Sequence, residues 1–124
     1  MSQDVISDAL NNMLNASRAG KSSVSLKKHS KLLLSVLAIA KLRGYVKSYR
    51  VENNMLNVEL GKIGHCQSIK PRFVVQVEEI EKYSKRYLPA KDIGIIIIST
   101  SSGLMTHHTA EEKNIGGSLI AYFY

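Results

Sequence analysis

The sequence predicts an α+β protein made of two small domains. Three observations support this prediction: the first half alternates between helical and strand periodicity, a connector with two glycines follows at residues 61–68, and short β-branched runs dominate the second half. We expect an N-terminal domain at residues 1–63 and a C-terminal domain at residues 64–124. With 124 residues and 44% apolar content, the chain can form a packed core.

The first segment, residues 4–17, predicts an amphipathic helix. Its apolar residues recur three and four positions apart, which is the spacing of one helical face. Asp4 and Asp8 near its start and Arg18 beyond its end match the helix dipole. Gly20 is a suitable terminator. The face that we expect to be buried consists of Val5, Ile6, Ala9, Leu10, Met13 and Leu14.

A short strand and a second helix follow. Residues 22–26 alternate serine with Val24 and Leu26, which is the pattern of a half-buried strand. Ser30 is placed to cap the next helix, because its hydroxyl can accept a hydrogen bond from a free amide at the helix start. We expect this helix to end near Gly44. Its wide apolar stripe comprises Leu32, Leu33, Val36, Leu37, Ile39 and Ala40.

Residues 45–52 and 55–60 predict a β-hairpin. Both segments alternate in the strand period, and the pair Asn53-Asn54 between them suits a two-residue turn with positive φ angles. The N-terminal domain is therefore expected to be an α-β-α-β-β two-layer unit, in which two helices cover one face of a three-stranded sheet.

The C-terminal domain is expected to be a mainly antiparallel β unit with one short helix. A polar segment at residues 78–86 separates the first two expected strands. The helix prediction rests on the capping-box spacing of Thr109-Ala110-Glu111-Glu112, and Gly116 is expected to end this helix in the left-handed conformation. The strands are expected at residues 73–77, 93–99 and 118–124.

Positive charge is concentrated in the first half of the chain. The formal net charge is +7, and residues 18–50 contain nine Lys or Arg and no Asp or Glu. A basic surface of this kind attracts a polyanion. The alternative interpretation is a solvated charged face without a partner.

The single cysteine, Cys66, excludes an internal disulfide framework. No opening apolar stretch resembles a signal peptide, and no run approaches the roughly 20 apolar residues of a membrane span. We therefore expect a soluble protein of the reducing cytoplasm, without a membrane partner. The pairs His65-Cys66 and His107-His108 lack the usual spacing of zinc ligands, so we expect neither a metal nor a cofactor.

The most distinctive stretch is residues 94–103, in which a β-branched run ends in four consecutive hydroxyl side chains and a glycine. Hydroxyls both donate and accept hydrogen bonds, and glycine lets a partner approach the backbone closely. We interpret this stretch as a binding edge rather than a catalytic site. The pair Gly116-Gly117 is expected to support or join the same surface. The hydroxyl run consists of Ser99, Thr100, Ser101 and Ser102, and Gly103 follows it.

Several short motifs occur in the order typical of one known family. The serine-rich loop, preceded by a buried strand and followed at a fixed distance by Gly-Gly, is the most specific of them. The chain resembles the universal small-subunit ribosomal protein eight family, in its archaeal and eukaryotic branch. The other matching motifs are Ser30-Lys31-Leu32, Gly44-Tyr45-Val46, Lys70-Pro71-Arg72-Phe73, Tyr87-Leu88-Pro89-Ala90 and Ile115-Gly116-Gly117.

The resemblance implies a structural constituent of the small ribosomal subunit, with no enzymatic activity, cofactor or small-molecule substrate. It implies a primary rRNA-binding protein that binds helical RNA in the central domain of small-subunit rRNA and helps that domain assemble. Its other partners would be neighbouring small-subunit ribosomal proteins, and its location would be the cytoplasmic ribosome. RNA helices present a shallow minor groove lined with 2′-hydroxyls, which small hydroxyl side chains and backbone amides can read.

The expected RNA-binding residues form two groups. The serine-rich loop, the Gly-Gly pair and the adjacent His107 would supply selectivity, whereas basic side chains would supply affinity through phosphate contacts. Asn15, at the end of the first helix, either contacts RNA or merely completes the helix. The complete set is Ser99, Thr100, Ser101, Ser102, Gly103, His107, Gly116, Gly117, Asn15, Lys21, Lys27, Lys28, Ser30, Lys31, Lys70 and Arg72.

The alternative function is a small hydrolase that uses Ser101 or Cys66 as its nucleophile and His107 as its base. Such an enzyme needs a deep pocket and a third group that orients the base. The sequence offers no orienting carboxylate, and neighbours in sequence rarely align for proton transfer. We therefore expect no catalytic residue.

Overall fold

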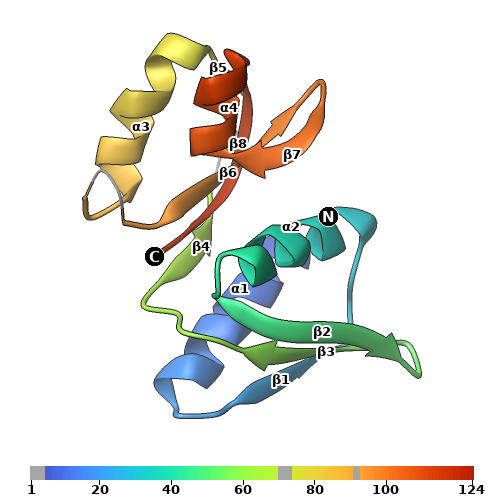
Figure 1. Ribbon diagram of the computed structural model, residues 1–124. Helices are drawn as coiled ribbons and strands as arrows, with labels where there is room; N and C mark the ends of the chain where they lie inside the picture. Colours follow the sequence, from blue (N-terminus) through green and yellow to red (C-terminus); the bar gives the residue numbers. More distant parts are fainter. Residues whose placement is uncertain (1–4, 70–73, 91–92) are drawn as a thin grey trace. The chain divides into compact units, whose positions relative to one another are not determined.

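The computed structural model describes residues 5–69, 74–90 and 93–124. The chain divides into two compact units, Met1–Gln67 and Ser68–Tyr124. Each unit combines helices with antiparallel strands (Figure 1). The predicted α+β class is therefore confirmed.

The N-terminal unit has the predicted α-β-α-β-β order. Its strands form an antiparallel sheet with β3 in the centre and β1 and β2 at the two edges. Helices α1 and α2 cover one face of this sheet (Figure 1). The elements are α1 (Val5–Arg18), β1 (Ser23–Leu26), α2 (Lys31–Leu42), β2 (Val46–Glu52) and β3 (Met55–Leu60).

Local sequence signals fix these elements as predicted. Ser30 caps α2, because its side chain accepts a hydrogen bond from the backbone N–H of Leu33 at 3.2 Å. Asn53 and Asn54 have φ angles of 51° and 62° and connect β2 to β3. The predicted face of α1 is buried, apart from the half-buried Val5: its buried residues are Ile6, Ala9, Leu10, Met13, Leu14 and Ala16.

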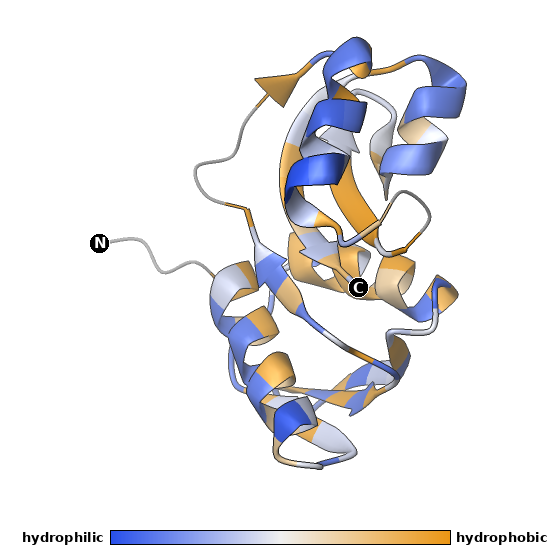
Figure 2. Ribbon diagram, turned by 90° about the vertical axis from the view of Figure 1, so that its left-hand side faces the viewer, coloured by the Kyte–Doolittle hydropathy of each residue, from blue (hydrophilic) through white to orange (hydrophobic). Residues whose placement is uncertain are grey.

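The sheet of the N-terminal unit separates an apolar face from a polar one. Along β3, Leu56, Val58 and Leu60 are buried, whereas Asn57 and Glu59 alternate with them and so lie on the opposite face. Figure 2 shows the same division of apolar and polar residues along the helices. The helices therefore pack on the apolar face of this sheet, and the polar face is exposed to solvent.

The C-terminal unit is built on a five-stranded sheet. The strand order is β4-β8-β6-β7, and β5 also pairs with β8. Strand β4 (Cys66–Ser68) crosses the boundary between the two units. The remaining elements are β5 (Val74–Val75), the 3-10 helix η1 (Val77–Glu79), α3 (Ile80–Tyr87), β6 (Ile95–Thr100), β7 (Gly103–Thr106), α4 (His107–Lys113) and β8 (Gly117–Phe123).

Both α-helices of this unit contribute to its core. Ile80 of α3 and Ala110 of α4 are buried in one cluster with residues of the sheet. Tyr87 and Tyr122 pack at the edge of this cluster, with ring centroids 5.2 Å apart. No helix among the described residues is long and apolar enough to cross a membrane. The cluster consists of Ile69, Val75, Ile80, Leu88, Ile96, Ile98, Met105, Ala110 and Leu119.

The prediction of three strands and one helix for the C-terminal domain is wrong. The described residues also include α3, β4 and β7. Polar residues dominate α3, which buries only Ile80 and Ser84. Strand β4 has only three residues, and the apolar residues Leu104 and Met105 of β7 are adjacent and so do not alternate with polar ones. The strand expected at residues 73–77 is reduced to Val74–Val75, and Phe73 lies outside the described residues.

Helix α4 begins and ends earlier than predicted. Its N-cap is Thr106, whose side chain accepts a hydrogen bond from the N–H of Thr109 at 3.3 Å. Its C-cap is Asn114, which has a left-handed φ of 57°. The expectation that Thr109 opens the helix and Gly116 ends it is therefore wrong. Thr106 caps the helix three residues before Thr109, and Asn114 ends it two residues before Gly116 with the same left-handed conformation.

Candidate nucleic-acid interface

The serine-rich loop is a tight turn between β6 and β7. We call residues 100–103 the serine turn: Thr100 pairs with Gly103 across the hairpin, and Ser101 and Ser102 form the tip. Within the turn only Gly103 has a positive φ, at 104°. This combination is typical of a type I turn followed by a bulged glycine. The chain therefore needs Gly103 for its backbone conformation, and no atom lies within 4 Å of where its Cβ would stand.

The hydroxyl groups of the serine turn have different surroundings. The Oγ1 of Thr100 donates to the carbonyl of Gly103 at 2.8 Å and accepts from the N–H of Ser102 at 3.0 Å. Ser101 and Ser102 are exposed, and their hydroxyls make no hydrogen bond with another described residue. Each serine hydroxyl can donate one hydrogen bond and accept two. The hydroxyls of Ser101 and Ser102 are thus available to a partner, whereas the hydroxyl of Thr100 makes the hydrogen bonds that hold the turn together.

The two glycines after α4 allow the strands behind the serine turn to pack closely. A Cβ on Gly117 would collide with the carbonyl oxygen of Ser99, and a Cβ on Gly116 would collide with that of Val75. Ser99 is also the partner of Ser118 across β6 and β8. The structure therefore gives the two glycines a packing role, and a direct contact with RNA remains a prediction for them.

His107 lies in the interior, not on the surface beside the serine turn. The residue is 1% exposed, and its Nδ1 accepts a hydrogen bond from the backbone N–H of Ile96 at 3.1 Å. The Thr106 cap places His107 in the first turn of α4, where its ring contacts that of His108 at a centroid distance of 4.0 Å. The expectation of an RNA contact by His107 is corrected on this ground: the ring supports β6.

Several predicted polar contacts line one groove of the N-terminal unit. Two neighbouring hollows of about 410 and 480 Å³ share Asn12 and Ser25 and follow α1 and β1, and we call them together the α1–β1 groove. Three lysines and one aspartate line it, so its charge is positive. The charged and amide side chains of the groove are Asp8, Asn12, Asn15, Lys21, Lys27 and Lys28.

Asn12, Ser23 and Ser25 also line this groove, although the sequence patterns did not predict it. Asn12 lies three residues before Asn15 on α1, a spacing that places two side chains on the same helical face. Ser23 and Ser25 also line the groove from β1. The alternation of β1 already separated these serines from Val24 and Leu26, but the sequence did not indicate that α1 lies beside this strand.

The other predicted contacts are distributed differently. Lys31 is exposed as the first residue of α2. The Ser30 hydroxyl accepts the Leu33 N–H, so its established role is that of a helix cap. Lys70 and Arg72 lie outside the described residues.

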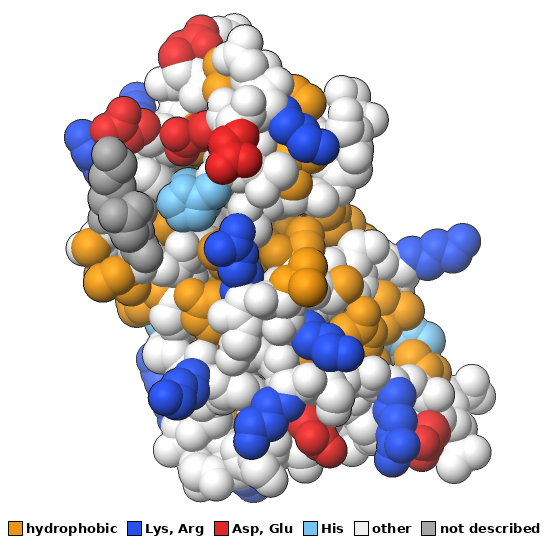
Figure 3. Space-filling view, in the orientation of Figure 1, with side chains coloured by type: hydrophobic (Ala, Val, Ile, Leu, Met, Phe, Trp, Pro, Cys, Tyr) orange, Lys and Arg blue, Asp and Glu red, His pale blue; other side chains and the backbone are white. Residues whose placement is uncertain are grey.

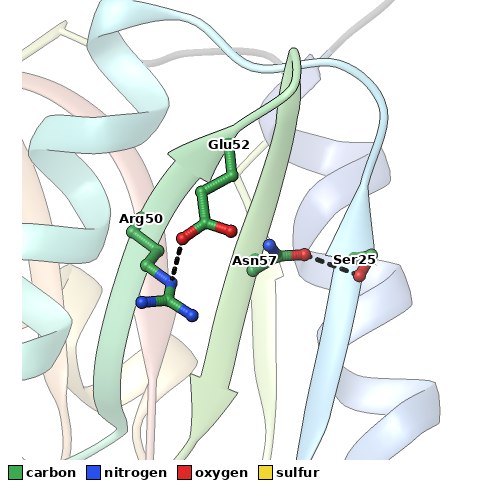
Figure 4. A network of polar contacts seen from close by, with 4 residues as sticks. All are labelled: Ser25, Arg50, Glu52 and Asn57. Atoms are coloured by element: carbon green, nitrogen blue, oxygen red, sulfur yellow. Dashed lines mark hydrogen bonds and ion pairs between the residues drawn. The ribbon is translucent and has the colours of Figure 1, made fainter.

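The polar face of the N-terminal sheet carries groups that already pair with one another. The Nε of Arg50 lies 2.9 Å from a carboxylate oxygen of Glu52, and the hydroxyl of Ser25 donates to the side-chain oxygen of Asn57 at 2.7 Å (Figure 4). Because Glu52 balances the charge of Arg50, this face attracts a polyanion less than the groove does. On the face drawn in Figure 3, Lys and Arg side chains are spread over the N-terminal unit beside a few acidic ones, whereas acidic side chains cluster on the C-terminal unit, which also carries Lys or Arg.

The residues considered for a hydrolase are not arranged for catalysis. Cys66 is fully buried, and its Sγ donates to the carbonyl of Leu10 at 3.4 Å. Burial raises the pKa of the Cys66 thiol to about 12, and the positive charge of Arg18 lowers it only in part. A protonated, buried thiol is a poor nucleophile. The Nδ1 of His107 is already bonded to the Ile96 amide.

Comparison with known proteins agrees with the family resemblance. The family described as ribosomal protein S8 matches residues 4–124. The small ribosomal subunit protein uS8 of Nanoarchaeum equitans (strain Kin4-M) is 40% identical over 129 residues, which cover 100% of both chains. A match over this length includes both structural units, the serine turn and the α1–β1 groove. The chain therefore belongs to the S8 family of small-subunit ribosomal proteins, and it is a structural protein rather than an enzyme.

Proposed function

We propose that this protein is a primary rRNA-binding protein of cytoplasmic ribosomes, which binds helical RNA in the central domain of small-subunit rRNA and helps that domain assemble. The observation that supports this function best is the serine turn. Its two exposed hydroxyls are presented at the tip of a hydrogen-bonded hairpin. Neighbouring small-subunit proteins would complete its surroundings.

The serine turn has the chemistry needed to read an RNA minor groove. That groove is wide and shallow and displays 2′-hydroxyls and base edges, so short side chains can reach it. Ser101 and Ser102 bring small donors and acceptors, and Gly103 adds no side chain that would hold RNA at a distance. The anchoring of the hairpin in the sheet limits the entropy lost on binding.

The α1–β1 groove supplies a second kind of contact. Its lysines can neutralise phosphates, and its asparagine amides can donate to phosphate oxygens. Phosphate contacts carry affinity but little sequence information. We therefore assign selectivity to the serine turn and salt-dependent affinity to Lys21, Lys27 and Lys28.

The serine turn is tested by the double substitution Ser101→Ala, Ser102→Ala. We expect about 30-fold weaker binding to a central-domain rRNA fragment, because two hydrogen bonds of about 1 kcal/mol each are lost. Binding to an unrelated RNA duplex should stay unchanged. A gel-shift titration with both RNAs at two salt concentrations measures this difference.

The matched control for the double substitution is Ser35→Ala. Ser35 is exposed on α2, and its hydroxyl donates to the Lys31 carbonyl within the helix. This variant should bind both RNAs like the wild type. If the double variant also binds the rRNA fragment as tightly as the wild type, the serine turn is not the selective contact and the proposed function loses its main support.

The groove is tested by the triple substitution Lys21→Gln, Lys27→Gln, Lys28→Gln. We expect weaker binding to both RNAs and a salt dependence reduced by about one power of salt concentration per lysine, since each released counterion contributes about one. The measurement is the slope of log affinity against log salt concentration.

The matched control for the groove replaces three exposed lysines of the same unit that do not line it, Lys41→Gln, Lys47→Gln and Lys62→Gln. This variant has the same net charge as the groove variant. Equal slopes for the two variants would show that the lysines act through overall charge, which contradicts a specific role for the groove.

A further inference from the structure

Within the serine turn, Thr100 differs from the two serines at the tip. Its hydroxyl has a single proton, and that proton is used in the 2.8 Å hydrogen bond to the Gly103 carbonyl. One of its lone pairs accepts the Ser102 N–H at 3.0 Å. Thr100 could donate to RNA only by giving up a bond that closes the hairpin.

The two hydrogen bonds of Thr100 hold both halves of the turn. The hydrogen bond from the Ser102 N–H to the Thr100 hydroxyl holds the tip of the turn against the end of β6. The hydrogen bond from the Thr100 hydroxyl to the Gly103 carbonyl holds the residue that begins β7. Threonine side chains that bond the backbone two residues on are known to mimic a backbone turn. At Gly103 the positive φ of 104° lets the chain return to the register in which Thr100 pairs with Gly103.

The surroundings of the turn give it little other support. Ser101, Ser102 and Gly103 are exposed, and the space around the position of a Gly103 Cβ is empty to 4 Å. The first buried side chains on either side of the turn are Ile98 on β6 and Met105 on β7, which pair across the hairpin. Apart from the backbone pairing between β6 and β7, the side-chain hydrogen bonds of Thr100 are therefore the main constraint on the conformation of the tip.

We propose that Thr100 is a positioning residue for RNA recognition: it fixes the spacing of the Ser101 and Ser102 hydroxyls and does not itself contact RNA. This inference rests on the proposed function, because it assumes that these hydroxyls are the selective contacts. It assigns different roles to neighbouring hydroxyl residues that look equivalent in the sequence.

The experiment compares Thr100→Val, which keeps the branched shape but lacks the hydroxyl, with Thr100→Ser, which keeps the hydroxyl. In the free protein, the Ser102 amide of Thr100→Val should exchange its hydrogen at least several-fold faster than in wild type, whereas Thr100→Ser should retain the wild-type rate. Thr100→Val should bind the central-domain rRNA fragment about tenfold more weakly, with unchanged binding to an unrelated duplex. Thr100→Ser should bind both RNAs within about twofold of wild type.

A double-mutant cycle separates positioning from direct contact. In the background of Ser101→Ala, Ser102→Ala, a positioning residue has nothing left to position, so Thr100→Val should cause no further loss of rRNA affinity. A full additional tenfold loss in that background would show that Thr100 contacts RNA directly and would overturn the inference. An unchanged Ser102 amide exchange rate in Thr100→Val would overturn it as well.

The failure of this inference differs from the failure of the proposed function. If the double serine variant binds the rRNA fragment as the wild type does, the function assigned to the turn fails and the positioning role fails with it. If the double serine variant loses selective binding but Thr100→Val does not, only the role of Thr100 is wrong.

Discussion

Substituting Gly117 by alanine is expected to destabilise the C-terminal unit by about 3 kcal/mol. Gly117 is the first residue of β8, and a Cβ there would collide with the carbonyl oxygen of Ser99 and lie 2.9 Å from the carbonyl carbon. Backbone atoms in the middle of a sheet cannot move aside as a flexible side chain can. The strands must separate, and this weakens the ladder between β6 and β8.

The measurement is the free energy of unfolding from urea denaturation. Because the chain contains no Trp, far-UV circular dichroism is the suitable signal. Hydrogen exchange of amides in β6 then locates the loss of stability, which should be greatest near Ser99, the residue paired with Ser118.

The matched control is Gly103→Ala. At Gly103 an added Cβ meets no atom within 4 Å, but φ is 104°, so only backbone strain is introduced. This strain costs about 1–2 kcal/mol. A Gly117→Ala variant that is as stable as the wild type would show that β8 does not approach β6 this closely, and the packing role assigned to the glycine pair would be wrong.

Cys66 is expected to react with a thiol reagent about a thousandfold more slowly in the folded protein than in the unfolded chain at pH 8. Burial raises the pKa of its thiol from 9.0 to about 12, so the reactive thiolate is scarce. The thiol also donates a hydrogen bond to the Leu10 carbonyl, which requires its protonated form. The rate of reaction with Ellman's reagent, in buffer and in guanidinium chloride, measures the difference.

The raised thiol pKa also predicts how stability depends on pH. Below pH 9.0 the thiol is protonated in both the folded and the unfolded protein, so its contribution to stability is fully present. As the pH rises from 9.0 towards about 12, the unfolded chain releases this proton first, and the contribution is lost. A Cys66→Ala variant, which has no thiol to ionise, should lack this part of the pH dependence. Rapid, complete labelling of folded Cys66 at pH 8 would contradict its burial.

Local sequence patterns predicted the N-terminal unit well because its signals act over a few residues. Ser30 caps α2, and Asn53 and Asn54 form the hairpin turn, because each of these conformations depends on the residue's own side chain and its nearest amides. The strand alternation of β3 likewise identified its buried face. In the C-terminal unit the same approach missed α3 and β7, whose apolar positions are too few for a periodic signal.

In the candidate site, too, local sequence patterns identified the types of residue but not the contacts that they make. The serine-rich stretch was identifiable because four hydroxyl residues follow a β-branched run, yet only the folded turn distinguishes the engaged hydroxyl of Thr100 from those of Ser101 and Ser102. The lysines were identifiable as a charge excess, but their grouping with Asn12 and Ser25 depends on α1 lying beside β1.

By itself, the sequence determined the α+β class, the order of the N-terminal elements and the concentration of positive charge, because each of these depends on composition or on short-range periodicity. The family followed from the resemblance of short motifs that occur in a fixed order along the chain. Only the tertiary structure decided that His107 is buried beneath β6, that Gly116 and Gly117 serve close strand packing, and that the lysines border a groove. These properties depend on which distant segments meet. A single residue's type does not encode that information, because burial and close approach are properties of pairs of surfaces.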